Sequence, residues 1–92
     1  MPMEKYYKSD NDFIEYSHVF TGFWKTFEEK DKLLEFLNQD IMLARPIAYH
    51  VGDHFEEWLN SSIPALDDIT PLECLETSQG IKRLKTCLQR FP

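Results

Sequence analysis

The side chains of this sequence that could do chemistry are two cysteines, three histidines and sixteen acids. Cys74 and Cys87 are too few for a disulfide framework, and in a reducing compartment such thiols are normally buried. His50 and His54 are four residues apart, but the Gly-Asp pair between them indicates a helix break, so they are not expected to share a helix face. No further ligand has the spacing that a metal site requires. We therefore expect two buried thiols and no metal site.

The acidic residues fall where the hydrophobic periodicity marks solvent-facing helix surfaces, and such positions serve solubility more often than catalysis. The sequence has three glycines and no glycine-rich phosphate loop, and it pairs no nucleophile with a base. We therefore expect a protein that is not an enzyme and holds no cofactor. The acids on these polar faces are Glu28, Glu29, Asp31, Glu56 and Glu57.

The length of 92 residues predicts one domain that buries roughly 60 to 65% of its unfolded surface, which is enough for a modest core. Seven Phe, four Tyr and two Trp allow that core to be dense. No apolar run approaches the ~18 residues of a membrane-spanning helix, and the N-terminus holds no hydrophobic signal segment. The sequence therefore predicts a cytoplasmic protein with no membrane partner.

The charge is unevenly distributed along the chain. Residues 1–80 contain six Lys or Arg and all sixteen acids, a net charge of -10, and residues 81–92 contain four Lys or Arg and no acid, a net charge of +4. The acidic body argues against a large phosphate-binding surface, which needs several basic contacts. The basic end has two interpretations, which are favourable electrostatics at a helix C-terminus and attraction to an anionic partner surface. Its cations are Lys82, Arg83, Lys85 and Arg90.

The first half of the chain shows helical periodicity. Gly22 is expected to end a first amphipathic helix near Thr21, with one continuous bent helix as the alternative. A strand over residues 18–27 is a second alternative, because short apolar runs discriminate poorly. The ten N-terminal residues are polar with two tyrosines and are expected to fray or pack loosely. The aromatic residues at intervals of three and four are Phe13, Tyr16, Phe20, Phe23 and Phe27.

Three further helices have recognisable starts. The sequence Thr-Phe-Glu-Glu at 26–29 predicts a capping box ahead of the leucines at 33, 34 and 37. Asp40 is expected to cap the next segment, which is kinked or starts afresh near Pro46. Asp53 and Glu56 are expected to cap a short helix that carries Trp58.

The segment 58–88 contains the strongest helix signals. After Trp58 and Leu59 it predicts a tight apolar turn over residues 63–66. Thr70 and Glu73 have the spacing of a capping box, with a proline at the first helical position. Thr77 is the expected cap of the last helix, whose single apolar stripe is Ile81, Leu84, Leu88 and Phe91. The whole chain therefore predicts an all-α fold, a compact single domain of about five or six short helices, with an N-terminal helical region (1–50) and a second region (51–92) packed as one domain.

The order Gly-Asp, Trp-Leu, Pro-Ala-Leu, Thr-Pro-Leu-Glu, Leu, Thr and Gly resembles the C-terminal toxin-binding domain of the MbcA/ParS/Xre antitoxin family. Two features depart from the family pattern: Asp67-Asp68 stands where members usually have glycine, and the sequence stops at Pro92 rather than running into a further short tail. The matching residues are Gly52, Asp53, Trp58, Leu59, Pro64, Ala65, Leu66, Thr70, Pro71, Leu72, Glu73, Leu75, Thr77, Gly80, Leu84, Leu88 and Arg90.

The resemblance implies an antitoxin of a type II toxin-antitoxin system. Members of the family pair with RES-domain toxins, which degrade NAD, and they block access to the toxin's active site. Such inhibition needs apolar anchors with a polar rim. The expected partner-binding residues are Ile63, Pro64, Leu66, Leu72, Glu73, Lys82, Arg83 and Arg90. The alternative for the large apolar residues is packing, because Trp58, Leu59, Leu66, Leu72, Leu75 and Leu84 could form the core of the module instead.

Three other functions stay open. Many related antitoxins bind operator DNA through an N-terminal helix-turn-helix, but the first 50 residues are acidic and show no basic recognition helix, so DNA binding is possible but disfavoured. A small acidic inhibitor or adaptor that occupies a basic groove on a nucleic-acid-binding protein is the main alternative. A structural module that forms a homo-oligomer, alone or within a complex, is the third.

Overall fold

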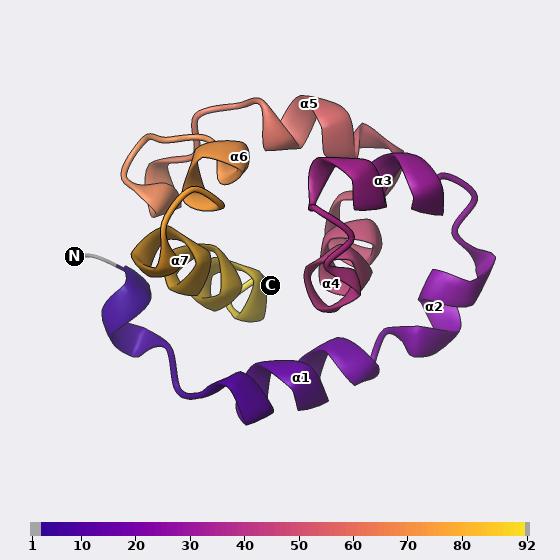
Figure 1. The fold of residues 1–92 in the computed structure, drawn as a ribbon, viewed down its shortest axis with the longest axis horizontal. Helices are drawn as coiled ribbons and strands as arrows, with labels where there is room; N and C mark the ends of the chain where they lie inside the picture. Colours follow the sequence, from indigo (N-terminus) through magenta and orange to yellow (C-terminus); the bar gives the residue numbers. More distant parts are fainter. Residues whose placement is uncertain (1–2, 92) are drawn as a thin grey trace.

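Seven α-helices and three short 3₁₀ helices make up the computed structural model, which describes residues 3–91 (Figure 1). Six of the α-helices have five or more residues and the seventh has four, which confirms the all-α prediction. Within the described residues the only strand-like pairing is an isolated antiparallel bridge between Ile63 and Ile69. The elements are η1 (Met3–Tyr6), α1 (Asp10–His18), α2 (Thr21–Thr26), α3 (Lys30–Phe36), α4 (Ile41–Val51), η2 (Gly52–His54), α5 (Phe55–Leu59), η3 (Pro64–Leu66), α6 (Pro71–Cys74) and α7 (Ser78–Gln89).

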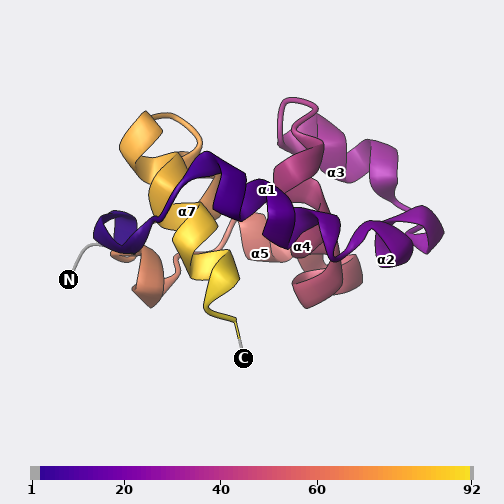
Figure 2. The same cartoon turned by 90° about the horizontal axis from the view of Figure 1, so that it is seen from below.

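The two longest helices, α4 and α7, define the arrangement of the others. Helix α1 packs on both of them, α2 and α3 pack on α4, and α6 and η1 pack on α7 (Figure 1). Helices α4 and α7 run in the same direction, so that their C-terminal ends lie on one side of the molecule (Figure 2). No helix in the described part of the chain is long and apolar enough to cross a membrane.

One core cluster includes residues from both halves of the chain. Large apolar side chains of α1, α3 and α4 contact those of α5, η3 and α7, and they exclude water from the interior. The most deeply buried of these side chains are Phe13, Leu33, Leu37, Leu43, Ile47, Phe55, Leu59, Leu66, Leu84 and Leu88.

Helix α4 continues through a buried proline. Pro46 has no N–H, so the carbonyl of Met42 loses the helical hydrogen bond that residue 46 would normally donate. The hydroxyl of Ser17, which is fully buried in α1, donates to this Met42 oxygen at 2.7 Å. The expected alternative of a fresh helix start near Pro46 is therefore wrong, because a side chain from α1 replaces the missing donor.

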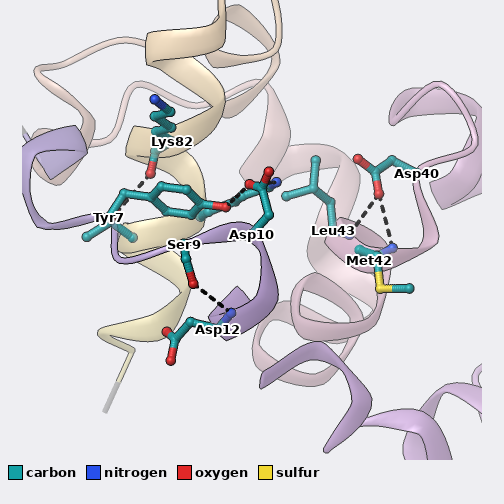
Figure 3. Close-up of polar contacts among 10 residues, drawn as sticks. Tyr7, Ser9, Asp10, Asp12, Asp40, Met42, Leu43 and Lys82 are labelled. Carbon is teal, nitrogen blue, oxygen red and sulfur yellow. Dashed lines mark hydrogen bonds and ion pairs between the residues drawn. The ribbon is translucent and has the colours of Figure 1, made fainter. Parts of the chain in front are cut away.

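Several helix starts follow their predicted caps. The carboxylate of Asp40 accepts from the backbone N–H groups of Met42 and Leu43 (Figure 3). Ser9, which was not predicted as a cap, caps α1 through the N–H of Asp12. The capping box between Thr70 and Glu73 has both of its hydrogen bonds, at 3.1 Å each, and Thr77 accepts from the N–H of Gly80 at 2.9 Å. The predicted start sites of α4, α6 and α7 are confirmed.

The predicted capping box at residues 26–29 is wrong. Thr26 is the last residue of α2, and its hydroxyl donates to the carbonyl of Phe23 at 2.9 Å. Helix α3 begins only at Lys30, and Glu29 before it makes no side-chain cap. A threonine with helical backbone at the end of one helix does not have the extended backbone that an N-cap usually needs.

The break after α1 also differs from the prediction. Helix α1 ends at His18, and α2 begins at Thr21 and contains Gly22, so Gly22 does not interrupt the helical pattern. The chain turns instead at Val19 and Phe20, where Phe20 leaves the helical range (φ -95°, ψ 10°). The strand alternative for this segment and the continuous bent helix are both wrong.

The start of α5 is not capped by acids as expected. The 3₁₀ turn η2 leads directly into α5, and the N–H of Phe55 already bonds to the carbonyl of Gly52. His54 occupies the cap position without a side-chain hydrogen bond. Glu56 pairs on the surface with Lys32 instead, with Nζ and Oε1 2.7 Å apart.

The N-terminal segment packs against α7 and does not fray over its described residues. The Tyr7 hydroxyl donates to the carboxylate of Asp10 (Figure 3), and the ammonium of Lys85 lies 5.7 Å from the Tyr7 ring centre. The guanidinium of Arg90 lies 4.5 Å from the ring centre of Tyr6. The expectation of loose packing is wrong here, because aromatic rings in a polar segment bind the cations of the last helix.

Replacing Ser17 with alanine is expected to destabilise the fold by about 1–3 kcal/mol, because the Met42 carbonyl beside Pro46 would lose its donor. In a Pro46→Ala background the new N–H at residue 46 can serve that carbonyl, so the cost of Ser17→Ala should be smaller. Urea unfolding of the four variants of this cycle measures the difference. An equal cost of Ser17→Ala in both backgrounds would contradict this role of the hydroxyl.

Candidate functional site

The turn between α5 and α6 is a compact, hydrogen-bonded loop. The N–H of Ile63 bonds to the carbonyl of Ile69 at 3.1 Å, and the Ile63 carbonyl accepts from the N–H groups of Leu66 (2.8 Å) and Asp68 (3.1 Å). Pro64 is exposed at the tip, and Ile63 is half-buried. Leu66 is fully buried in the core. The turn therefore presents a proline to solvent and is anchored from below by a leucine.

Two consecutive aspartates give the turn its shape. Asp67 and Asp68 have φ values of 60° and 63°, in the left-handed region that usually favours glycine. Aspartate tolerates this region better than most side chains. The Asp67 carboxylate also lies 3.5 Å from the guanidinium of Arg83, which joins the turn to α7. The two aspartates therefore adopt a left-handed backbone conformation that most other side chains would disfavour.

Helices α6 and α7 contact each other backbone to backbone. A Cβ on Gly80 would lie 2.3 Å from the carbonyl oxygen of Cys74, so only glycine fits at this crossing. Cys74 and Cys87 are free and buried, as predicted. Burial raises the pKa of the Cys74 thiol to about 11, against a smaller lowering effect of Arg83. Both thiols are therefore protonated and serve packing.

The cations of α7 have different surroundings. Lys82 is exposed. Arg83 pairs with Asp67 of the turn, and Lys85 lies 3.9 Å from an Asp10 oxygen and 5.1 Å from the Phe13 ring centre. Arg90, which follows α7, stacks on Tyr6 of η1. Lys85 and Arg90 therefore both face the N-terminal segment.

Comparison with protein families assigns the C-terminal part of the chain. Residues 51–91 match the model of the antitoxin Xre/MbcA/ParS C-terminal toxin-binding domain. This segment, 41 of the 92 residues, is similar to an antitoxin toxin-binding domain, and we call residues 51–91 the toxin-binding domain. No curated protein and no solved structure gave a significant match to the chain. The family is not enzymatic, so the expectation that the protein is not an enzyme is confirmed.

The toxin-binding domain contains η2, α5, η3, α6 and α7. Elements η2, α5 and α7 pack on α4, α7 also packs on α1, and η3 and α6 pack on α7. It brings the exposed Pro64 and the half-buried Ile63 close to Arg83 through the Asp67 ion pair. Leu66 is a core residue, so its side chain is packed inside and does not reach the surface of the turn. Leu66 therefore serves core packing, which is the alternative role expected for the large apolar residues.

The remaining predicted site residues are spread over the toxin-binding domain. Leu72 is half-buried, and Glu73 is exposed with its carboxylate bonded to the N–H of Thr70. Lys82 lies on the exposed side of α7. Arg90 follows the end of α7 and lies two turns away from Arg83, so it does not join the group around the turn.

Sequence reasoning missed a surface cluster outside the toxin-binding domain. Phe23 and Tyr49 are 40% and 52% exposed, and their rings are 5.5 Å apart. The helical spacing of Phe23 with buried aromatics predicted a core position. Nothing in the sequence marked Tyr49 as exposed, because it belongs to the apolar helix α4. Only the fold shows that the C-terminal end of this helix is uncovered.

Replacing Gly80 with alanine is expected to destabilise the protein by about 1–3 kcal/mol, because the new methyl group overlaps the Cys74 carbonyl. The matched control is Gly22→Ala, where the added methyl group would have no atom within 4 Å. That change in a helix interior should stabilise by about 0.5–1 kcal/mol. Thermal unfolding of both variants distinguishes them, and equal shifts would contradict the close approach.

The Cys74 thiol predicts a pH dependence at the alkaline end. Its folded pKa of about 11 exceeds the ordinary value of 9.0, so its contribution to stability is complete below about pH 9. Above that pH the unfolded thiol ionises first, and the contribution declines until pH 11. Urea unfolding from pH 8 to 10.5 should therefore show a steeper loss of stability for the wild type than for Cys74→Ala. Parallel curves would show that the thiol does not titrate in this way.

Proposed function

We propose that this protein is the antitoxin of a type II toxin-antitoxin system, which binds a RES-domain, NAD-degrading toxin in the cytoplasm and blocks access to its active site. The observation that carries the proposal is the match of residues 51–91 to the antitoxin toxin-binding domain. The assignment of a RES-domain toxin as the partner rests on the resemblance of this segment to the antitoxin family. The protein contributes no chemistry and acts by occlusion.

The turn supports occlusion because its shape is fixed before binding. Three backbone hydrogen bonds and the pair between Asp67 and Arg83 hold Pro64 at the surface. A preformed loop loses little conformational entropy when it enters a partner's pocket. Pro64, Ile63 and Leu72 are the proposed apolar anchors, and Lys82 is a proposed rim charge.

We propose that residues 1–50 are the scaffold of the same domain and do not bind DNA. Their large apolar side chains belong to the core cluster that also contains Leu59, Leu66 and Leu84 of the toxin-binding domain. Lys30 donates to the carbonyl of Lys25, and Lys32 pairs with Glu56. The basic groups of this region are therefore partly engaged within the protein, and the region is acidic overall.

Co-expression with a candidate toxin from the same genome tests the proposal. The antitoxin should restore growth and cellular NAD, and the purified complex should hydrolyse NAD far more slowly than the free toxin. A toxin that stays active in the presence of excess antitoxin would refute occlusion. A partner that lacks NAD-degrading activity would refute the RES assignment.

Charge placed on the turn is expected to weaken the complex. Pro64→Glu should weaken toxin binding at least tenfold, because an anchor residue becomes a desolvated charge, and Lys82→Glu should mainly slow association. Glu35→Lys is the matched control, since Glu35 is an exposed charge on α3, away from the turn. Surface plasmon resonance gives both rate constants. Unchanged binding by Pro64→Glu would exclude the turn from the interface.

A further inference from the structure

A continuous row of rings crosses from the N-terminal region into the toxin-binding domain. Phe23 of α2 lies 5.5 Å from Tyr49, which lies 5.2 Å from His50, both in α4. His50 stacks on Phe91 at 4.7 Å with an interplanar angle of 15°, and Phe91 lies 6.1 Å from Trp58. We call these five residues the aromatic band. All of these distances are measured between ring centroids.

Three of the five rings lie at the ends of the two longest helices, since Tyr49 and His50 are in the last turn of α4 and Phe91 follows α7. Tyr49 and Phe23 are 52% and 40% exposed, and His50, Phe91 and Trp58 are half-buried. Rings of this size are rarely left uncovered together on a soluble monomer, and such patches commonly mark interaction sites. The band is therefore a candidate contact surface.

Hydrogen bonds of the Tyr16 hydroxyl hold the residues beneath the band in place. The Tyr16 hydroxyl donates to the carbonyl of Leu88 at 2.6 Å and lies 2.8 Å from Nε2 of His50. A phenol has one hydrogen, so Nε2 of His50 carries the proton and donates to Tyr16. Burial lowers the pKa of His50, which keeps the ring neutral. One hydroxyl thus joins α1, α4 and α7 directly below the exposed rings.

Two hollows lie near the band. One of about 260 Å³ is lined by Val51, His54, Glu57, Trp58 and Ser61, and it leads from Trp58 of the band to the start of the turn. The other, about 560 Å³, lies between α1 and the end of α7; no band residue lines it, but Tyr16, which bonds to His50, does. Hollows beside aromatic residues accept the anchor side chains of a partner.

We propose that the aromatic band is part of the surface that binds the toxin, and that Phe23 and Tyr49 extend this interface beyond the toxin-binding domain. The inference rests on the proposed function. The band is continuous with the toxin-binding domain through Phe91 and Trp58, and through the smaller hollow it reaches Ser61 at the start of the turn. A standard interface involves about 20–30 residues on each side, more than the turn supplies.

Charge indicates the chemistry of the toxin surface that fits here. The C-terminal ends of α4 and α7 carry partial negative charge, and ring faces attract cations. Residues 1–80, which supply most of the surrounding surface, have a net charge of -10. The occupant is therefore an apolar region of the toxin that includes Arg or Lys side chains.

The test uses the full chain and the toxin identified by the co-expression experiment. Tyr49→Ser and Phe23→Ser should each weaken toxin binding at least tenfold by isothermal titration calorimetry, mainly through faster dissociation. Tyr49→Phe should keep the affinity. Ile14→Ser is the matched control, because Ile14 of α1 is 36% exposed and lies outside the band, and it should change the affinity less than twofold. Urea unfolding checks that every variant is folded.

The outcomes separate this inference from the proposed function. Full affinity in Tyr49→Ser and Phe23→Ser would overturn the inference alone. Loss of self-association in these variants by sedimentation, with unchanged toxin binding, would also overturn it and assign the band to a second copy of this chain. Failure of the wild type to bind the toxin would overturn both. A bound toxin without NAD-degrading activity would refute only the RES assignment.

Discussion

The hydrogen bond from Ser17 to the Met42 carbonyl is the constraint on which the arrangement of helices depends. Helix α4 is the central element, with Leu43, Ala44, Ile47 and Ala48 all buried, and a proline inside such a helix would normally break it. The hydroxyl from α1 satisfies the one carbonyl that Pro46 leaves without a donor. Helix α1 is thereby fixed on α4, and α4 continues without a break through Pro46.

The toxin-binding domain also depends on the N-terminal region. Its small helices α5 and α6 have five and four residues, too short to be stable alone in water. They are held by packing on the core, and α6 is held also by the backbone contact with Gly80 of α7. The hydrogen bond from Tyr16 of α1 to the Leu88 carbonyl fixes the end of α7. A family match of 41 residues therefore describes a segment whose shape is partly set by residues outside it.

The sequence predicted the features that depend on neighbouring residues and missed those that depend on distant ones. The caps at Asp40, Thr70 and Thr77 need only residues two or three positions away, and all three were predictable. The packing of Lys85 on Tyr7 and Phe13 joins segments far apart in the chain, so the N-terminus could not be placed. Leu66 and Pro64 lie two residues apart in one turn, and only the fold decides which is buried. Ser17 gave no signal, because its role depends on a proline 29 positions later.

The two left-handed aspartates have a consequence for the time course of binding. Glycine at these positions would be unstrained in the same conformation, but it would also let the turn adopt other shapes in solution. A turn of fixed shape has no slow rearrangement to complete after collision, so association is governed by encounter and orientation. The departure from glycine thus favours rapid association with a partner over adaptability to different partners.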